Sequence, residues 1–178
     1  MNIGIVSDTH GRVDRLRLAL DMFAGRSVQA VVHCGDIGSP ECLEALADLG
    51  VPAYAVGGNM DDRTDALPRL AERTGVTFAW SSLAFLVAKA EGTAENTFAA
   101  VTHGDDPRRL AELVNDPDNR FVFHGHTHCQ RDEHVDRGER AAPVHIINPG
   151  ALYKPRHPAQ PTVAVLDTET DAVEFLDV

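Results

Sequence analysis

The chain has 178 residues, of which 43% are hydrophobic and 24% are charged. These values fit one soluble globular domain over residues 1–178 and exclude a disordered or fibrous chain. The formal net charge of −11 disfavours duplex nucleic acid or an anionic membrane surface as the main partner, because both would repel the protein.

The first third of the chain predicts alternating strands and helices. Short apolar runs typical of buried strands occur at residues 2–7, 29–33 and 52–56. A helical stripe covers 13–23, and a second helix is expected from Pro40, after the cap Ser39, to Gly50. This order predicts parallel strands joined by helical crossovers.

The remaining two thirds predict a mixed arrangement. A short helix is expected at 66–73, and another begins at Pro107 with Asp106 as its cap. Strands are expected at residues 76–79, 83–88, 97–102, 121–123, 144–147, 162–166 and 172–176. We therefore expect a mixed sheet or two packed sheets flanked by helices, with an exposed turn at 91–96.

Targeting and redox features favour a cytoplasmic protein. The longest apolar run, about Leu83 to Ala88, is far shorter than the ~20 residues needed to span a bilayer. The start of the chain lacks the basic and apolar stretches of a signal peptide. The three cysteines, Cys34, Cys42 and Cys129, form no CxxC pair, which favours reduced thiols.

Five predicted strands end in short polar motifs. In chain order these motifs are Asp8-Thr9-His10-Gly11, Gly35-Asp36, Gly57-Gly58-Asn59-Met60-Asp61, His103-Gly104-Asp105 and Gly125-His126-Thr127-His128. Each motif alone is also typical of a cap, a turn or a solvated loop. Their joint occurrence at the carboxyl ends of strands, where α/β sheets usually bind ligands, favours one common site.

The residue types in these motifs indicate a metal centre. Asp8 and His10 are two residues apart, and so are His126 and His128; in extended backbone, such residues point to the same side. The candidate ligands are Asp8, His10, Asp36, Asn59, His103, His126 and His128. This mixed oxygen and nitrogen set suits Mn, Fe, Zn or Ni better than Ca or Mg. Seven candidates exceed what one ion needs, so a bridging carboxylate and two ions are expected.

The motif series DTH, GD, GNMD, THGD and GHTH resembles the calcineurin-like metallophosphoesterases. It is similar to their small single-domain bacterial and archaeal phosphodiesterase branch, which also includes the retromer subunit of the same fold. The likeness runs from Asp8 to Asn148-Pro149-Gly150 and Pro155-Arg156. It implies an α/β fold of four layers, in which two mixed β-sheets pack as a sandwich flanked by helices.

The resemblance also implies a binuclear metal centre that hydrolyses a phosphoester. One ion would be held by Asp8, His10, Asp36 and His128, and the second by Asp36, Asn59, His103 and His126. A hydroxide bridging the ions would attack the phosphorus of a small phosphodiester, or of a monoester, with Asp36, Asn59 and His103 at the catalytic centre. Two manganese ions are the first expectation, with iron, zinc and nickel left open.

The sequence departs from the family pattern at two positions. Met60 stands where many members have a histidine that is thought to protonate the leaving group, and Ala151 replaces a serine. General acid catalysis is worth ~10²–10⁴-fold, so esters with poor leaving groups are not expected as good substrates. Arg12, Asn148 and Arg156 are the expected substrate contacts.

A non-catalytic metal-binding or protein-interaction scaffold of the same fold is the alternative function. Loss of a ligand type would favour the scaffold, whereas all seven positions are present and favour hydrolysis. Two divalent ions beside Asp8 and Asp36 would make the site locally positive in an acidic protein. Small phosphoesters are therefore expected as substrates rather than long polyanions, and the oligomeric state is left open.

Overall fold

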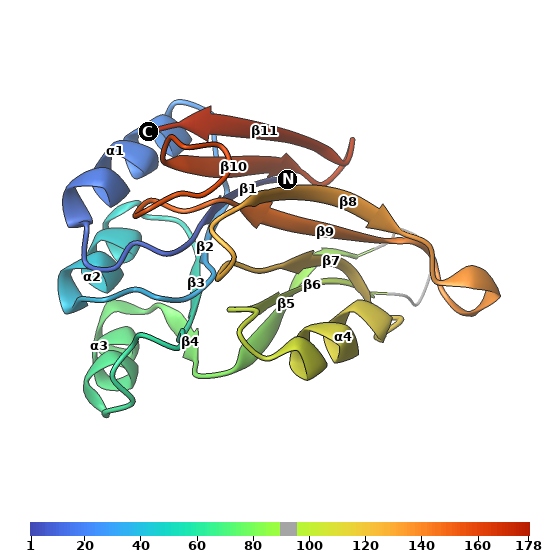
Figure 1. Ribbon diagram of the computed structural model, residues 1–178, viewed down its shortest axis with the longest axis horizontal. Helices are drawn as coiled ribbons and strands as arrows, with labels where there is room; N and C mark the ends of the chain where they lie inside the picture. The colour runs from blue at the N-terminus through green and yellow to red at the C-terminus, as the bar shows by residue number, and fades with distance from the viewer. Residues whose placement is uncertain (90–95) are drawn as a thin grey trace.

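The computed structural model describes residues 1–89 and 96–178 and contains two mixed β-sheets that face each other (Figure 1). The strands of the first sheet are β1 (Asn2–Val6), β2 (Ala30–His33), β3 (Ala53–Val56), β4 (Thr77–Ala79), β10 (Thr162–Asp167) and β11 (Ala172–Asp177). The strands of the second sheet are β5 (Ser82–Lys89), β6 (Asn96–Thr102), β7 (Asn119–Phe123), β8 (Gln130–Val135) and β9 (Val144–Pro149). The described helices are α1 (Val13–Ala24), α2 (Pro40–Asp48), α3 (Ala66–Thr74), α4 (Pro107–Asn115) and a short 3-10 turn, η1 (Gly138–Arg140).

Both sheets combine parallel and antiparallel pairs. The first sheet has the order β11-β10-β1-β2-β3-β4, in which β1 to β4 are parallel, β10 is antiparallel to β1, and β11 is antiparallel to β10. The second sheet has the order β5-β6-β7-β9-β8, with three parallel central strands and an antiparallel strand at each edge. The parallel strands of both sheets therefore end in loops, and these loops carry the polar motifs.

Three apolar clusters hold four layers together. Ile5 and Phe123 belong to the cluster between the two sheets. Helices α1, α2 and α3 cover the outer face of the first sheet, where Leu16 packs in one cluster with Val31. Helix α4 covers the outer face of the second sheet through Leu113. This arrangement confirms the predicted fold of two mixed sheets packed as a sandwich and flanked by helices.

The predicted elements are present, with ends that differ by no more than two residues. Asp106 caps α4 by accepting hydrogen bonds from the backbone amides of Arg108 and Arg109, at 2.9 and 3.4 Å. Strand β8 was not predicted, because its sequence QRDEHV contains a single apolar residue. It lies at a sheet edge and pairs through its backbone with β9, so apolar periodicity carries no signal for it. The turn expected at 91–96 lies outside the described residues, apart from Asn96 at the start of β6.

Within residues 1–89 and 96–178, none of the helices has the length and apolar character needed to cross a bilayer. This agrees with the short apolar runs of the sequence. The apolar residues of the helices are instead used for packing against the sheets.

The Asp61 carboxylate ties together two of the loops that carry polar motifs. It accepts backbone hydrogen bonds from Ile37 at 3.0 Å, from Gly38 at 2.7 Å and from Gly58 at 2.9 Å. The first two amides follow Asp36, and the third precedes Asn59. One buried side chain therefore fixes the loops after β2 and β3 relative to each other.

Gly4 allows the first helix to approach the first sheet closely. A Cβ atom at this position would lie 2.6 Å from two ring carbons of Phe23 on α1, a distance shorter than any normal contact. We expect Gly4→Ala to lower the free energy of unfolding by about 1–3 kcal/mol, as overpacking of a core does. Urea denaturation would measure the change. Gly25→Ala is the matched control because its nearest neighbour would lie at 3.6 Å. Equal stability of the two variants would contradict this account of the packing.

Asp61→Asn tests the connection between the two loops. An amide offers one acceptor oxygen and brings an NH₂ group among three N–H donors, so at least one amide loses its partner. The free energy of unfolding should fall by about 1–3 kcal/mol, and divalent cations should bind more weakly. Denaturation and metal titration measure these effects, and Asp62→Asn, an exposed neighbour, serves as the control. A variant as stable as the control would show that the loops do not depend on Asp61.

Candidate metal centre

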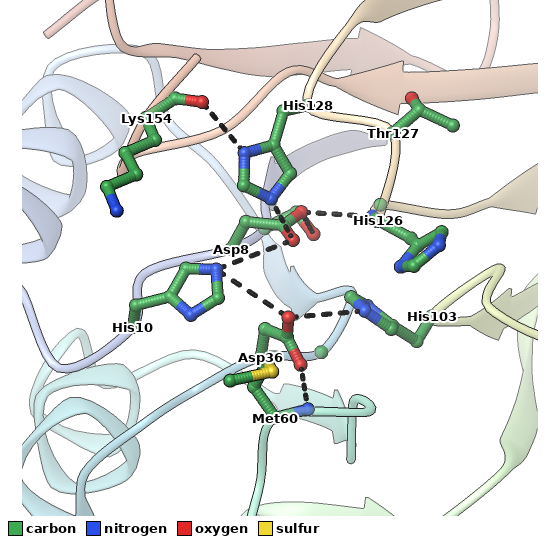
Figure 2. Close-up of polar contacts among 12 residues, drawn as sticks. Asp8, His10, Asp36, Met60, His103, His126, Thr127, His128 and Lys154 are labelled. Atoms are coloured by element: carbon green, nitrogen blue, oxygen red, sulfur yellow. Dashed lines mark hydrogen bonds and ion pairs between the residues drawn. The ribbon is translucent and has the colours of Figure 1, made fainter. Parts of the chain in front are cut away.

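The seven predicted ligands converge on one region, where loops from both sheets meet; Figure 2 shows six of them, and Asn59 contacts His103 and His126. Asp8 and His10 follow β1, Asp36 follows β2, and Asn59 follows β3. The second sheet contributes His103 after β6, and His126 and His128 after β7. The structure therefore brings together residues that are up to 120 positions apart in the chain.

Asp8, His10 and His128 form the first half of the cluster. Their donor atoms lie within 4.8 Å of one another. Asp8 Oδ1 is 3.0 Å from His128 Nε2 and 3.9 Å from His10 Nε2. One carboxylate and two imidazoles thus face a common point.

Asp36, Asn59, His103 and His126 form the second half. Asp36 Oδ2 is 3.5 Å from His103 Nε2, and it is also 3.6 Å from His10 Nε2 in the first half. Asn59 Oδ1 lies 3.0 Å from both His103 Nε2 and His126 Nδ1. Asp36 therefore stands between the two halves, where a carboxylate shared by two cations would stand.

Backbone carbonyls set the orientation of two histidine rings. His103 Nδ1 donates to the carbonyl oxygen of Cys34, and His128 Nδ1 donates to that of Lys154, both at 2.8 Å. Because a carbonyl can only accept, each Nδ1 carries a hydrogen, and each Nε2 faces the carboxylates. This is the outer hydrogen bond that orients histidine ligands in metal sites.

Two donor atoms of the cluster favour a bound cation. Among the residues that the structure describes, neither Asp8 Oδ1 nor His10 Nε2 has a hydrogen-bond partner, although both atoms are buried. A buried polar atom left in this state costs about 1–3 kcal/mol. Divalent cations would satisfy both atoms, so the residues present fit the metal ions that the sequence predicts.

Five of the seven ligand candidates have left-handed backbone conformations. The φ angles are 53° for Asp8, 46° for His10, 54° for Asp36, 65° for His126 and 58° for His128. The extended backbone expected for the Asp8–His10 and His126–His128 pairs is therefore wrong. The side chains of each pair converge through tight left-handed turns, and such strain concentrates at functional sites.

Two glycines make room for the ligands. Gly35 has a φ of 95°, and a Cβ there would lie 2.6 Å from His103 Nδ1. A Cβ at Gly125 would lie 2.7 Å from Asp8 Oδ2 and would overlap the Ser7 hydroxyl. The glycines of these motifs therefore allow side chains from different loops to crowd around one centre.

The carboxylates keep their negative charge in spite of burial. Burial raises the pKa of Asp8, but its contacts with His128 and Ser7 outweigh this, so the pKa falls below its usual value. The pKa of Asp36 is also lowered, because His103 outweighs its burial. Burial lowers the pKa of His103, yet the Asp36 carboxylate raises it to about 9. The protein thus presents charged carboxylates to whatever cation occupies the centre.

The three expected substrate contacts occupy different environments. Arg12 is exposed before α1, with its guanidinium carbon 5.2 Å from the centre of the Tyr153 ring. Arg156 is also exposed, and its backbone amide donates to the carbonyl of His128 at 2.9 Å. The Asn148 side chain is fully buried and donates to the carbonyl of Gly125 at 2.9 Å. Asn148 therefore holds the loop of His126 and His128 and does not open toward solvent.

Some residues around the centre were not predicted. The Ser7 hydroxyl donates to Asp8 Oδ2 at 2.6 Å, and the Tyr153 ring centre lies 5.3 Å from that of His10. Lys154, whose φ is 49°, contributes its carbonyl to His128. Ser7 directly precedes the predicted ligand Asp8, and this position in the sequence could have indicated that its hydroxyl contacts the ligand. Lys154 acts through its backbone, and residue type gives no indication of that. Asp105, the last residue of the motif that begins at His103, is exposed.

Known proteins resemble this chain over nearly its whole length. A model of the calcineurin-like phosphoesterase superfamily domain matches residues 1–171. The phosphodiesterase MJ0936 of Methanocaldococcus jannaschii is 28% identical over 177 residues, which cover 95% of this chain and 94% of that protein. A solved archaeal phosphodiesterase superposes with a TM-score of 0.80 at 27% identity and full coverage of both chains.

A more distant structure agrees in fold alone. Yfce, a phosphoesterase from E. coli, has a TM-score of 0.67 at 20% identity, again with full coverage of both chains. The sheet order, the loop cluster and the family match lead to one conclusion: the chain belongs to the calcineurin-like phosphoesterase superfamily.

Proposed function

We propose that the chain is a metal-dependent phosphodiesterase that acts on small phosphodiesters with good leaving groups. The observation that carries this proposal is the convergence of seven donor side chains, in which Asp8 Oδ1 and His10 Nε2 are buried and lack a hydrogen-bond partner within the described residues. The similarity to a named phosphodiesterase over most of the chain supports a diester substrate. Hydrolysis of a monoester by the same site is the second outcome of the assay below.

Two divalent cations fit the donor set. Asp8, His10, Asp36 and His128 would hold one cation, and Asp36, Asn59, His103 and His126 the other. Oxygen and nitrogen donors together favour manganese, with iron, zinc or nickel as further occupants. When bound, such ions supply Lewis acidity toward phosphoryl oxygens and lower the pKa of water.

The side chains of this protein would position the reacting groups. Asn59 and His126 are exposed and therefore border the face from which a substrate enters. Asp36, Asn59 and His103 contact one another in the cluster and would lie next to the reacting phosphoryl group. The exposed guanidinium groups of Arg12 and Arg156 would bind its non-bridging oxygens.

Met60 restricts the range of esters. Its side chain is 67% exposed, and Figure 2 shows it beside Asp36 at the edge of the cluster. A thioether cannot donate a proton to a departing alkoxide, so at this position the chain lacks a general acid. Leaving groups that depart as stable anions avoid this need, which is why a diester of a phenol is the better test substrate.

The distribution of charge supports a small substrate. The net charge of −11 repels long polyanions, whereas divalent cations at Asp8 and Asp36 would make the entrance locally positive. The proposed setting is a single cytoplasmic domain without duplex nucleic acid or a membrane as a partner.

Removal of a shared or an exposed ligand tests the proposal. We expect Asp36→Ala and His126→Ala each to lower kcat/KM for bis(p-nitrophenyl) phosphate by at least about 100-fold, equivalent to about 2.7 kcal/mol. The assay would compare this diester with p-nitrophenyl phosphate in Mn²⁺ and Ni²⁺. Asp105→Asn is the matched control, since Asp105 is an exposed carboxylate two residues after His103. Activity that survives both ligand substitutions would contradict the metal mechanism, and absence of activity in every metal would favour the scaffold.

Arg12→Ala and Arg156→Ala test the proposed phosphate contacts. Loss of a charge-assisted hydrogen bond worth about 1.5–3 kcal/mol should raise KM roughly 10-fold or more and leave kcat nearly unchanged. Steady-state kinetics with the same diester would separate the two constants. Arg17→Ala on α1 is the control, because Arg17 is exposed and pairs with Asp48. If both variants had the KM of the control, neither arginine would contact the substrate.

A further inference from the structure

A second cluster of metal-ligand side chains lies on the edge strand β8 and its neighbour β9. Asp132 and His134 come from β8, and His145 comes from β9. One donor atom from each residue lies within 4.8 Å of the other two. None of these residues belongs to the metal centre described above.

The register of the two strands holds the cluster in place. His134 is directly opposite His145 in the antiparallel pair, and Asp132 is two residues before His134. Residues two apart on a strand share a face, and directly opposite residues have neighbouring Cβ atoms. The three side chains therefore meet because of the sheet itself rather than through a loop.

His145 is the buried member of the cluster. Its side chain is 2% exposed, and its Nε2 lies 2.6 Å from Asp132 Oδ1. Within the described part of the chain, its other nitrogen, Nδ1, is buried and has no hydrogen-bond partner. Because Nε2 is the nitrogen that faces Asp132, it is the atom that this ring would share with the Asp132 carboxylate at a cation.

Asp132 and His134 make the cluster accessible to an ion. The Asp132 side chain is 44% exposed, and His134 is also exposed. The rings of His134 and His145 are stacked, with centres 3.9 Å apart and an angle of 24° between their planes. Ligand atoms around a tetrahedral zinc ion stand about 3.4 Å apart. The exposed Asp132 carboxylate would therefore have to move away from His145 Nε2, and the exposed His134 ring would have to turn, for the three donors to surround the ion.

We propose that Asp132, His134 and His145 form a second binding site for a late first-row divalent cation such as Zn²⁺. Two imidazoles and one carboxylate are a donor set that zinc accepts, with the remaining position open to water. Magnesium and calcium prefer oxygen ligands and fit this site less well. The site is independent of the phosphodiesterase proposal, since it shares no residue with it.

A cation at this site would fasten β8 to β9. Strand β8 has one strand neighbour, and its sequence is rich in residues that strands disfavour. It begins two residues after His128, so β8 follows directly on the loop that carries His126 and His128. The cross-link would stabilise the edge of the sheet and, through it, this loop.

Zinc stoichiometry tests the inference directly. Chelator-treated protein would be dialysed against Zn²⁺, and bound zinc per chain measured by elemental analysis. We expect Asp132→Asn and His134→Ala each to bind one equivalent less than the unsubstituted chain, and Zn²⁺ to raise their thermal midpoint less. Both substitutions are at exposed positions, which keeps the buried His145 intact.

Glu133→Gln is the matched control, because Glu133 is exposed on the same strand and faces the other side. It should bind as much zinc as the unsubstituted chain. Equal zinc content in all four proteins would overturn the inference. Zinc content is measured without an activity assay. The result therefore stands even if the protein proves to have no phosphodiesterase activity.

Discussion

The structure depends on two buried carboxylates, Asp8 and Asp36, which lie at the ends of neighbouring parallel strands. Charged groups in a protein interior are costly unless hydrogen bonds and opposite charges surround them. Asp8 accepts from the Ser7 hydroxyl and the His126 amide, and Asp36 accepts from the Met60 amide. These bonds leave one oxygen of each carboxylate toward the histidines, which is the condition for holding cations at a fixed place.

Holding these groups together requires backbone conformations that most residues avoid. Each residue held in a sparsely populated region costs of order 1–3 kcal/mol, and several ligand candidates are in this state. The surrounding structure offsets the cost through buried bonds, such as those from Asp61 to three amides and from Asn148 to Gly125. The sandwich core therefore supports a strained set of loops. The candidate site lies in loop conformations that the local sequence would not adopt without the surrounding structure.

Sequence patterns predict what depends on residue type and periodicity. Buried strands such as β1 and β7 are apolar runs, and ligand residues such as Asp8 and His126 follow them directly. Features that depend on the backbone are not predictable in this way. Strand β8 is held by pairing with β9, the Lys154 carbonyl orients His128, and the left-handed turn at His10 replaces the expected extended segment. None of these three changes the periodicity from which strands and helices are inferred.

Strand β9 connects the two regions in which metal-ligand residues gather. His145, near its beginning, faces Asp132 and His134, whereas Asn148, near its end, bonds the loop that carries His126 and His128. Both residues are buried, and they are three positions apart on one strand. Strand β9 is therefore paired with β8 along its length and bonded to the loop at the phosphoesterase centre through Asn148. A polar edge strand becomes understandable on this basis, because its side chains supply ligands and ion pairs where an apolar strand would supply packing.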